Sequence, residues 1–115
     1  MNEILPIISR GKVLTGTTTV AVYTTPLKMT AQFKAIYVSN LDTTTQTVTV
    51  EWYDKSLNTS FTIIKAGALA AANYVRIPMD EGLQLGPEDE IRVKADAANV
   101  LHAIVNVIEL PGRSK

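Results

Sequence analysis

The sequence predicts an all-β fold: a single β-sandwich, either jelly-roll or immunoglobulin-like, with seven to eight mostly antiparallel strands. Apolar and polar residues alternate with a period of two along most of the chain, which is typical of strands that bury one face. Turn signals recur about every ten residues. At 115 residues the chain is long enough for one domain, which we expect over residues 13–110, between an N-terminal arm (1–12) and a C-terminal tail (111–115).

Each strand is predicted from its alternation and from the turn residues that follow it. The predicted strands are 17–26, 31–41, 47–54, 59–65, 72–79, a short strand before Gly86, 90–95 and 99–110. The segment DTTTQ (42–46) predicts a hairpin loop, and KSLN (55–58) predicts a turn. The alanine-rich KAGALAAAN (65–73) is short, and we expect a loop there with at most one helical turn.

The segment TVTVEWYD (47–54) has two distinct faces. Val48, Val50 and Trp52 share one face, which predicts that Trp52 is buried in the core. Threonines and Tyr53 share the other face, where β-branched threonine favours the extended backbone and keeps a polar group in water. We therefore expect Tyr53 to be exposed and available for contact with a partner.

Composition excludes several classes of function. The chain has no cysteine, so disulfides, thiolate metal sites and cysteine nucleophiles are excluded. Its formal net charge is zero, which argues against a nucleic-acid partner, and no segment reaches the roughly 18 apolar residues of a membrane span. Charged residues make up only 19% of the chain, below the roughly 25% of an average domain. We expect a partner to cover part of this charge-poor surface.

No motif in the sequence indicates catalysis. His102 is the only histidine, and no local nucleophile or second strong metal ligand accompanies it, so we interpret it as a strand residue at an edge or interface. The chain has no GxGxxG, P-loop or GxSxG pattern. The sequence thus predicts a protein that is not an enzyme and that needs no cofactor or metal.

Acidic residues cluster near one turn. They could form a calcium site from loop oxygens, but their spacing does not match an EF-hand loop, and a solvated turn is the favoured interpretation. The cluster consists of Asp80, Glu81, Glu88, Asp89 and Glu90.

The predicted arm carries four apolar side chains before the first confident strand: Ile4, Leu5, Ile7 and Ile8. Side chains of this kind gain free energy only when something covers them. Strand addition to a neighbouring subunit would bury them, with a bend at Pro6. The alternative is that the arm adds a strand to its own sandwich.

Three segments share a layout with one known group of proteins: YTTP at the end of the first predicted strand, IYVSN before the threonine-rich loop, and LQLGPEDEIRV before and within a later strand. This layout resembles the small β-sandwich structural proteins of tailed-bacteriophage virions. The resemblance implies a non-enzymatic capsid decoration or cement protein, or alternatively a neck or tail adaptor.

The resemblance also implies a location and partners. The location would be the virion, assembled in the host cytoplasm. The partners would be the major capsid protein or portal and tail proteins, together with further copies of the chain in a homo-oligomer. From the residues alone, a carbohydrate- or receptor-binding module centred on Tyr53 remains the rival hypothesis.

Overall fold

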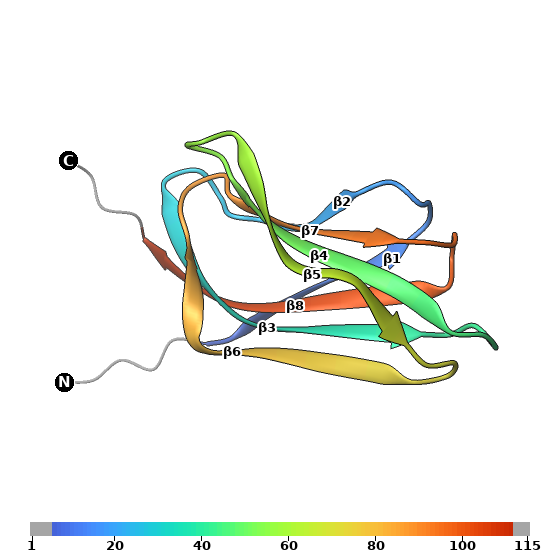
Figure 1. Cartoon of the computed structure of the whole chain (residues 1–115). Coiled ribbons are helices and arrows are strands. Elements are labelled where there is room, and N and C mark those ends of the chain that lie inside the picture. The colour runs from blue at the N-terminus through green and yellow to red at the C-terminus, as the bar shows by residue number, and fades with distance from the viewer. Residues whose placement is uncertain (1–5, 112–115) are drawn as a thin grey trace.

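The computed structural model describes residues 6–111, without the side chains of residues 66, 80 and 81, and within that range the chain forms eight β-strands and no helix (Figure 1). The strands are β1 (Ile8–Leu14), β2 (Val20–Thr24), β3 (Met29–Asn40), β4 (Gln46–Asp54), β5 (Thr59–Leu69), β6 (Tyr74–Leu85), β7 (Glu90–Ala95) and β8 (Leu101–Pro111). The predicted all-β class is confirmed.

The strands form two four-stranded antiparallel sheets within the described residues. Sheet A has the order β1-β8-β3-β6, and sheet B has the order β2-β7-β4-β5. The ladders include four nested pairs, β1 with β8, β2 with β7, β3 with β6 and β4 with β5. A long hairpin rolled into two sheets gives this pattern, which is that of a jelly roll and differs from the immunoglobulin strand order.

The core lies between the two sheets, and a bulge in β3 sets which side chains enter it. Ala31 and Phe33 point inward, the register shifts between Phe33 and Ala35, and Ile36 and Val38 then point inward in their turn. One extra residue reverses the alternation, since side chains in a strand have a period of two. The fully buried core side chains include Phe33, Ile36, Val38, Val50, Ile91, Val93, Leu101, Val105 and Val107.

The first strand begins inside the predicted arm. Residues 8–12 pair with β8 in an unbroken register that runs from Ile8 opposite Val107 to Leu14 opposite Leu101. This pairing satisfies the backbone groups along one edge of β8 and buries Leu14, which is 2% exposed. Ile7 precedes the strand and is exposed, and Ile4 and Leu5 lie outside the described residues. The arm therefore adds to its own sandwich from Ile8 onward.

Two loop predictions were wrong. Residues 42–46 do not form a hairpin, because β3 and β4 lie in different sheets and the segment crosses between them. Residues 65–69, expected in a loop, extend β5, where Leu69, Ala68 and Gly67 pair with residues 46–48. The alanines gave a weak helical signal that the sheet ladder overrides.

Asn40 fixes the crossing between β3 and β4. Its side-chain nitrogen donates to the carbonyl oxygens of Thr44 (3.0 Å), Leu69 (3.0 Å) and Ala70 (3.2 Å), and its side-chain oxygen accepts from the backbone nitrogen of Asp42 (2.9 Å). Asn40 itself is 2% exposed. One buried amide thus joins the end of β3, the crossing loop and the end of β5.

The crossing loop is stabilised further by Asp42. Its carboxylate accepts hydrogen bonds from Thr44 Oγ1 (2.9 Å), the backbone nitrogen of Thr43 (2.8 Å) and Gln46 Nε2 (2.5 Å). These bonds hold the pKa of Asp42 below its usual value, since they favour the charged form.

A second polar contact joins the two sheets at the other side. Tyr23 of β2 donates its hydroxyl to Glu109 Oε2 of β8 at 2.7 Å. Burial raises the pKa of Tyr23 far above its usual value, and the hydrogen bond to the Glu109 carboxylate raises it further. The phenol therefore stays a neutral donor throughout the physiological pH range.

We predict that Asn40→Ala lowers the free energy of unfolding by about 2–4 kcal/mol, because it leaves the buried carbonyl of Leu69 without its donor. Urea unfolding measures the change. The matched control is Asn73→Ala, since Asn73 is exposed and its side chain only accepts from the backbone nitrogen of Tyr74. A loss at Asn40 no larger than that at Asn73 would contradict this account of the crossing.

Candidate interaction surfaces

The outward side of sheet B carries the predicted contact residue Tyr53. Residues that pair directly across antiparallel strands share a face, so the register defines this surface. We call this surface the sheet B outer face. Its members form three rows across the strands: Ala21, Arg92, Glu51 and Thr62; Thr24, Glu90, Tyr53 and Ser60; and Lys94 with Thr49. Acids and bases lie side by side on it, and Arg92 Nε lies 2.6 Å from Glu90 Oε1.

Tyr53 is already engaged within the chain. The guanidinium carbon of Arg92 lies 3.8 Å from the centroid of its ring, and the Tyr53 hydroxyl donates to Asn58 Oδ1. The side chain is half-buried. A cation over an aromatic face occupies the surface on which a sugar ring would stack. The role of Tyr53 as a contact residue stays a prediction, and the structure gives the ring an internal partner.

Trp52 points toward the core, as its alternation with Val48 and Val50 predicts, but it is only half-buried. It lies opposite Phe61 of β5, with the two ring centroids 5.3 Å apart and an interplanar angle of 28°. Its indole nitrogen donates to Asp89 Oδ2 at 3.2 Å. Trp52 therefore closes the end of the core rather than filling its centre.

Asp89 fits neither interpretation of the acidic cluster, the solvated turn or the calcium site, because its carboxylate is buried and already accepts hydrogen bonds from the chain. It is 4% exposed. One carboxylate oxygen accepts from the backbone nitrogen of Lys55 (2.9 Å), and the other accepts from that of Gly86 (2.9 Å) and from Trp52. Its backbone oxygen accepts from Thr25 (2.8 Å). This single side chain joins the β6–β7 turn to the β4–β5 turn.

The rest of the acidic cluster gives no support for a metal site. Glu88 is exposed in the turn, and Glu90 pairs with Arg92. The side chains of Asp80 and Glu81 lie outside the described residues. Over the described part of the chain, no group of three or more His, Asp or Glu side chains is placed to hold a metal ion. The same residues include no helix that is long and apolar enough to cross a membrane.

The outward side of sheet A has a different chemical character. We call it the sheet A outer face and define it by three rows that run across β1, β8, β3 and β6 in register. The rows are Val13, His102, Ser39 and Tyr74; Gly11, Ile104, Tyr37 and Arg76; and Ser9, Asn106, Ala35 and Pro78. Among these twelve residues only Arg76 carries a permanent charge, and its guanidinium carbon lies 5.9 Å from the ring centroid of Tyr37.

Large apolar side chains are exposed on this face. Tyr74 is 64% exposed, Val13 45% and Ile104 42%. His102 is also exposed, between Val13 and Ser39 in its row, with no acid or base as a cross-strand neighbour. It does not lie at a sheet edge, since β8 is an interior strand, and its place at an interface stays a prediction. Beside Ile104 lies a shallow groove of about 230 Å³, where Gly11 has no side chain; its lining residues are Gly11, Lys12, Val13, His102, Ala103 and Ile104.

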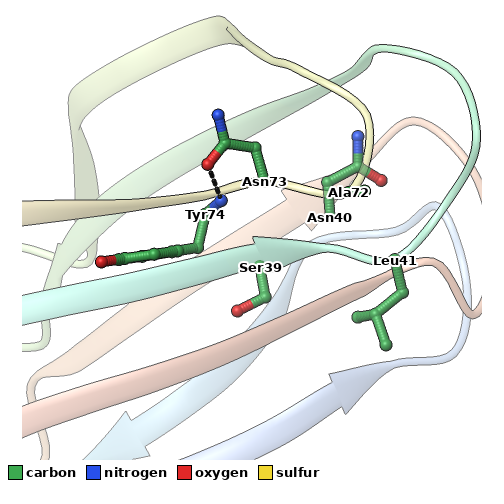
Figure 2. A pocket seen from close by; sticks show the side chains of 6 residues that line it. All are labelled: Ser39, Asn40, Leu41, Ala72, Asn73 and Tyr74. Atoms are coloured by element: carbon green, nitrogen blue, oxygen red, sulfur yellow. Dashed lines mark hydrogen bonds between the residues drawn. The ribbon is translucent and has the colours of Figure 1, made fainter.

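A second hollow lies at the end of this face, beside Tyr74. It has a volume of about 350 Å³ and is lined by Ser39, Asn40, Leu41, Ala72, Asn73 and Tyr74. Figure 2 shows the ring of Tyr74 lying along one side, with the Asn73 side chain accepting a hydrogen bond from the Tyr74 backbone nitrogen. An aromatic ring beside amide and hydroxyl groups is suited to binding a polar ligand.

Each of the four edge strands carries a feature that discourages pairing with another strand. In β1, Arg10 and Lys12 share the inward parity of Ile8 and Leu14 yet are exposed. Strand β2 has only five residues, and both β2 and β5 contain register shifts. Strand β6 contains Pro78, which lacks a backbone donor. The described strands therefore offer a second copy no flat, regular, uncharged edge, and pairing of the arm with another virion protein stays a prediction.

Comparisons with known proteins identify the fold alone. No family model matches the sequence, and no curated protein matches it. A chain in the acidic stable capsid structure of Helicobacter pylori bacteriophage KHP30 superposes with a TM-score of 0.57 at 9% identity, covering 97% of this chain and 92% of that one.

Two further solved structures are similar. A chain of the disulfide-linked pili that form Bacillus endospore appendages gives a TM-score of 0.50 at 14% identity and covers 98% of this chain and 95% of its own. A chain of infectious bursal disease virus, Gx strain, gives 0.51 at 8% identity, with 93% and 30% covered. The small sandwich thus corresponds to nearly the whole of the first two chains and to part of the third.

We predict that Asp89→Ala lowers the free energy of unfolding by about 3–5 kcal/mol, because three donors lose their acceptor at a buried site. Asp89→Asn should lie between Asp89→Ala and the wild type, since the amide can still accept one of the bonds. Glu88→Gln in the same turn is the control and should change stability by less than about 0.5 kcal/mol. Calcium should leave the melting temperature unchanged, and stabilisation by calcium that Asp89→Ala abolishes would restore the metal-site interpretation.

Proposed function

We propose that the protein is a non-enzymatic structural component of a tailed-phage virion, and specifically a capsid decoration or cement protein. The observation that carries the proposal is the unequal distribution of charge between the two outer faces. Sheet B presents Glu51, Lys94 and the ion pair of Arg92 with Glu90, whereas sheet A presents Val13, Ile104 and Tyr74 with one permanent charge, Arg76, in its rows and Lys12 at the groove beside Ile104. An exposed apolar surface on a chain of zero net charge indicates an interaction site.

Such a protein acts through contact rather than chemistry. Many copies on one particle multiply weak contacts, so a small surface on each copy can stabilise a large shell. The fold is compatible with this role, since it occurs in chains of a phage capsid structure and of pili. The partners we propose are the major capsid protein and further copies of this chain, in a virion assembled in the host cytoplasm. A neck or tail adaptor, with portal or tail proteins as partners, is the alternative position.

Quantitative mass spectrometry of purified virions from the phage that encodes the chain tests this proposal. A decoration protein should be present in numbers comparable to the major capsid protein, and particles that lack it should assemble but lose their genomes at a lower temperature. A few copies per particle, with loss of tailed particles on deletion, would favour the adaptor position. Absence of the chain from purified virions would refute a structural role.

A carbohydrate- or receptor-binding module is the second candidate function, and one observation favours it. Tyr74 is 64% exposed beside a hollow that Asn73 and Ser39 also line (Figure 2). Aromatic side chains with polar neighbours are suited to sugar recognition, and lectin domains include jelly rolls. The ring available for stacking is thus that of Tyr74, since Arg92 covers Tyr53.

Glycan-array binding of the isolated chain tests this second function. Specific binding that Tyr74→Ala abolishes, with Tyr53→Ala as the matched control, would support it. Under the structural proposal neither the wild type nor either variant binds glycans.

A further inference from the structure

Within the described residues, strand β1 hydrogen-bonds to one partner segment, which is β8 with the turn before it. The ladder to β8 runs over residues 8–14 without a register shift. Two further hydrogen bonds reach the same segment. Ser9 Oγ donates to Asn106 Oδ1 at 2.9 Å, and the carbonyl oxygen of Leu14 accepts from the backbone nitrogen of Asn99 at 2.9 Å. The polar contacts that hold β1 thus belong to one short stretch of the chain.

Few side chains anchor β1 in the core. Leu14 is 2% exposed and Ile8 is half-buried, whereas the five residues between them are exposed. Arg10 and Lys12 occupy inward positions among these five, and their charges favour water. Segments with few buried apolar contacts open at a lower free energy than the whole domain. These are the properties of a strand that detaches more easily than the rest of the sandwich.

The edge that β1 covers differs from the outer edges of the two sheets. Residues 101–107 of β8 (LHAIVNV) contain no proline, no glycine and no lysine, arginine or acid, and they pair with β1 in an unbroken register. A long, regular, uncharged edge is a template for another strand. The inner side chains of this segment also belong to the core. An uncovered β8 would therefore need a replacement strand, and β1 is the segment that fits it in register.

The loop between β1 and β2 is suited to act as a hinge. It consists of residues 15–19 (TGTTT), which are exposed apart from the half-buried Gly16. A Cβ added at Gly16 would meet no atom within 4 Å, so the chain does not pack tightly on the loop there. The loop spans six Cα–Cα steps of about 3.8 Å, so it reaches roughly 20 Å when extended. A change in its conformation would disturb no core residue.

We propose that neighbouring copies of the chain exchange β1, so that β1 of each copy covers β8 of the other. The inference rests on the proposed function and names the contact between copies of the chain. Exchange of an identical element keeps every β1–β8 contact found within one copy, and only the loop of residues 15–19 changes conformation. The occupant of the β8 edge is defined by the ladder itself, in which Val13 lies opposite His102.

The exchange depends on how close the copies are to one another. Within one copy, the short loop holds β1 beside β8 at an effective concentration in roughly the millimolar range. A free chain at micromolar concentration should therefore keep its own β1. Copies held side by side on a particle reach comparable local concentrations and should exchange. The same contacts thus keep the free chain monomeric and link the copies once they are assembled.

Shortening the hinge tests the exchange. Deleting residues 16–19 leaves one residue between β1 and β2, which lie in different sheets. Two Cα–Cα steps of about 3.8 Å cannot span sheets that pack about 10 Å apart, so β1 cannot reach its own β8. Sedimentation velocity at about 10 µM should show a dimer for the shortened chain and a monomer for the wild type. The matched control changes Thr17, Thr18 and Thr19 to serine at full loop length and should stay monomeric.

Disulfide formation tests the register, and the absence of native cysteine makes it selective. Val13→Cys and His102→Cys, in separate full-length chains, are refolded together from urea at about 1 mM and then oxidised with glutathione. These two positions are direct cross-strand neighbours, so the Cβ atoms come within disulfide range when β1 of one copy lies on β8 of the other. The mixed disulfide should form several-fold faster than between Val13→Cys and Ile104→Cys. Ile104 is also exposed on this strand but lies opposite Gly11.

Two results would overturn the inference. One is a shortened chain that folds but stays monomeric, with β1 unpaired. The other is a disulfide that forms no faster with His102→Cys than with Ile104→Cys. If the shortened chain does not fold, the disulfide rates decide alone, since they use the full loop. If both tests fail and the chain is still found in virions, its copies contact other surfaces, and the proposed function survives the failure of the inference.

Discussion

Strand β8 lies in the interior of sheet A and carries apolar side chains on both of its faces, with Ile104 between the polar His102 and Asn106 on the outer face. Leu101, Ala103, Val105 and Val107 are fully buried between the sheets, while Ile104 on the opposite side is 42% exposed. A strand with apolar residues on both faces is typical of sheets that are covered on both sides. In a single copy only the inner side is covered, and under the proposed function a partner covers the outer side.

The way the chain closes its core leaves the outer side of sheet A without a covering layer from the described part of the chain. Consecutive strands alternate between the sheets except at the β4–β5 hairpin, so most connections cross the ends of the sandwich. Buried polar groups stabilise these connections. Asn40 fixes the crossing between β3 and β4, and Asp89 joins the β4–β5 turn to the β6–β7 turn. The end loops also expose Leu27, Leu41 and Leu57. We propose the outer face of sheet A as the association surface because Val13, Ile104 and Tyr74 are exposed together on it.

Much of the fold could be predicted from the sequence, because alternation with a period of two is a local signal. The strands from Val20 to Asp54 and from Glu90 onward lie close to where the alternation placed them. Whether residues 42–46 form a hairpin or a crossing could not be predicted, since sheet membership depends on pairing with strands far along the chain. The β3 bulge could not be predicted either, because it reverses the alternation at a point where the sequence has no glycine, proline or other turn residue.

The site was harder to predict than the fold. The sequence predicts Tyr53 as a contact residue because it lies on the threonine face of its strand, but the guanidinium that covers its ring comes from β7. The sheet A outer face did leave a signal: the segment VLHAIVNVIEL is apolar at both parities, which fits a strand covered on both sides. The extent of the surface could not be predicted, because it depends on the register that places Val13, Tyr37 and Tyr74 in the same rows as Ile104 and His102.

The central claim is that sheet A, rather than sheet B, supplies the contact surface in the assembled state. Hydroxyl-radical footprinting of the free chain and of the chain in intact particles, read out by mass spectrometry, tests it most directly. The account predicts that assembly slows oxidation of Tyr74 and Tyr37 and leaves Tyr53 oxidised at its free rate. Protection of Tyr53, with Tyr74 unchanged, would contradict it.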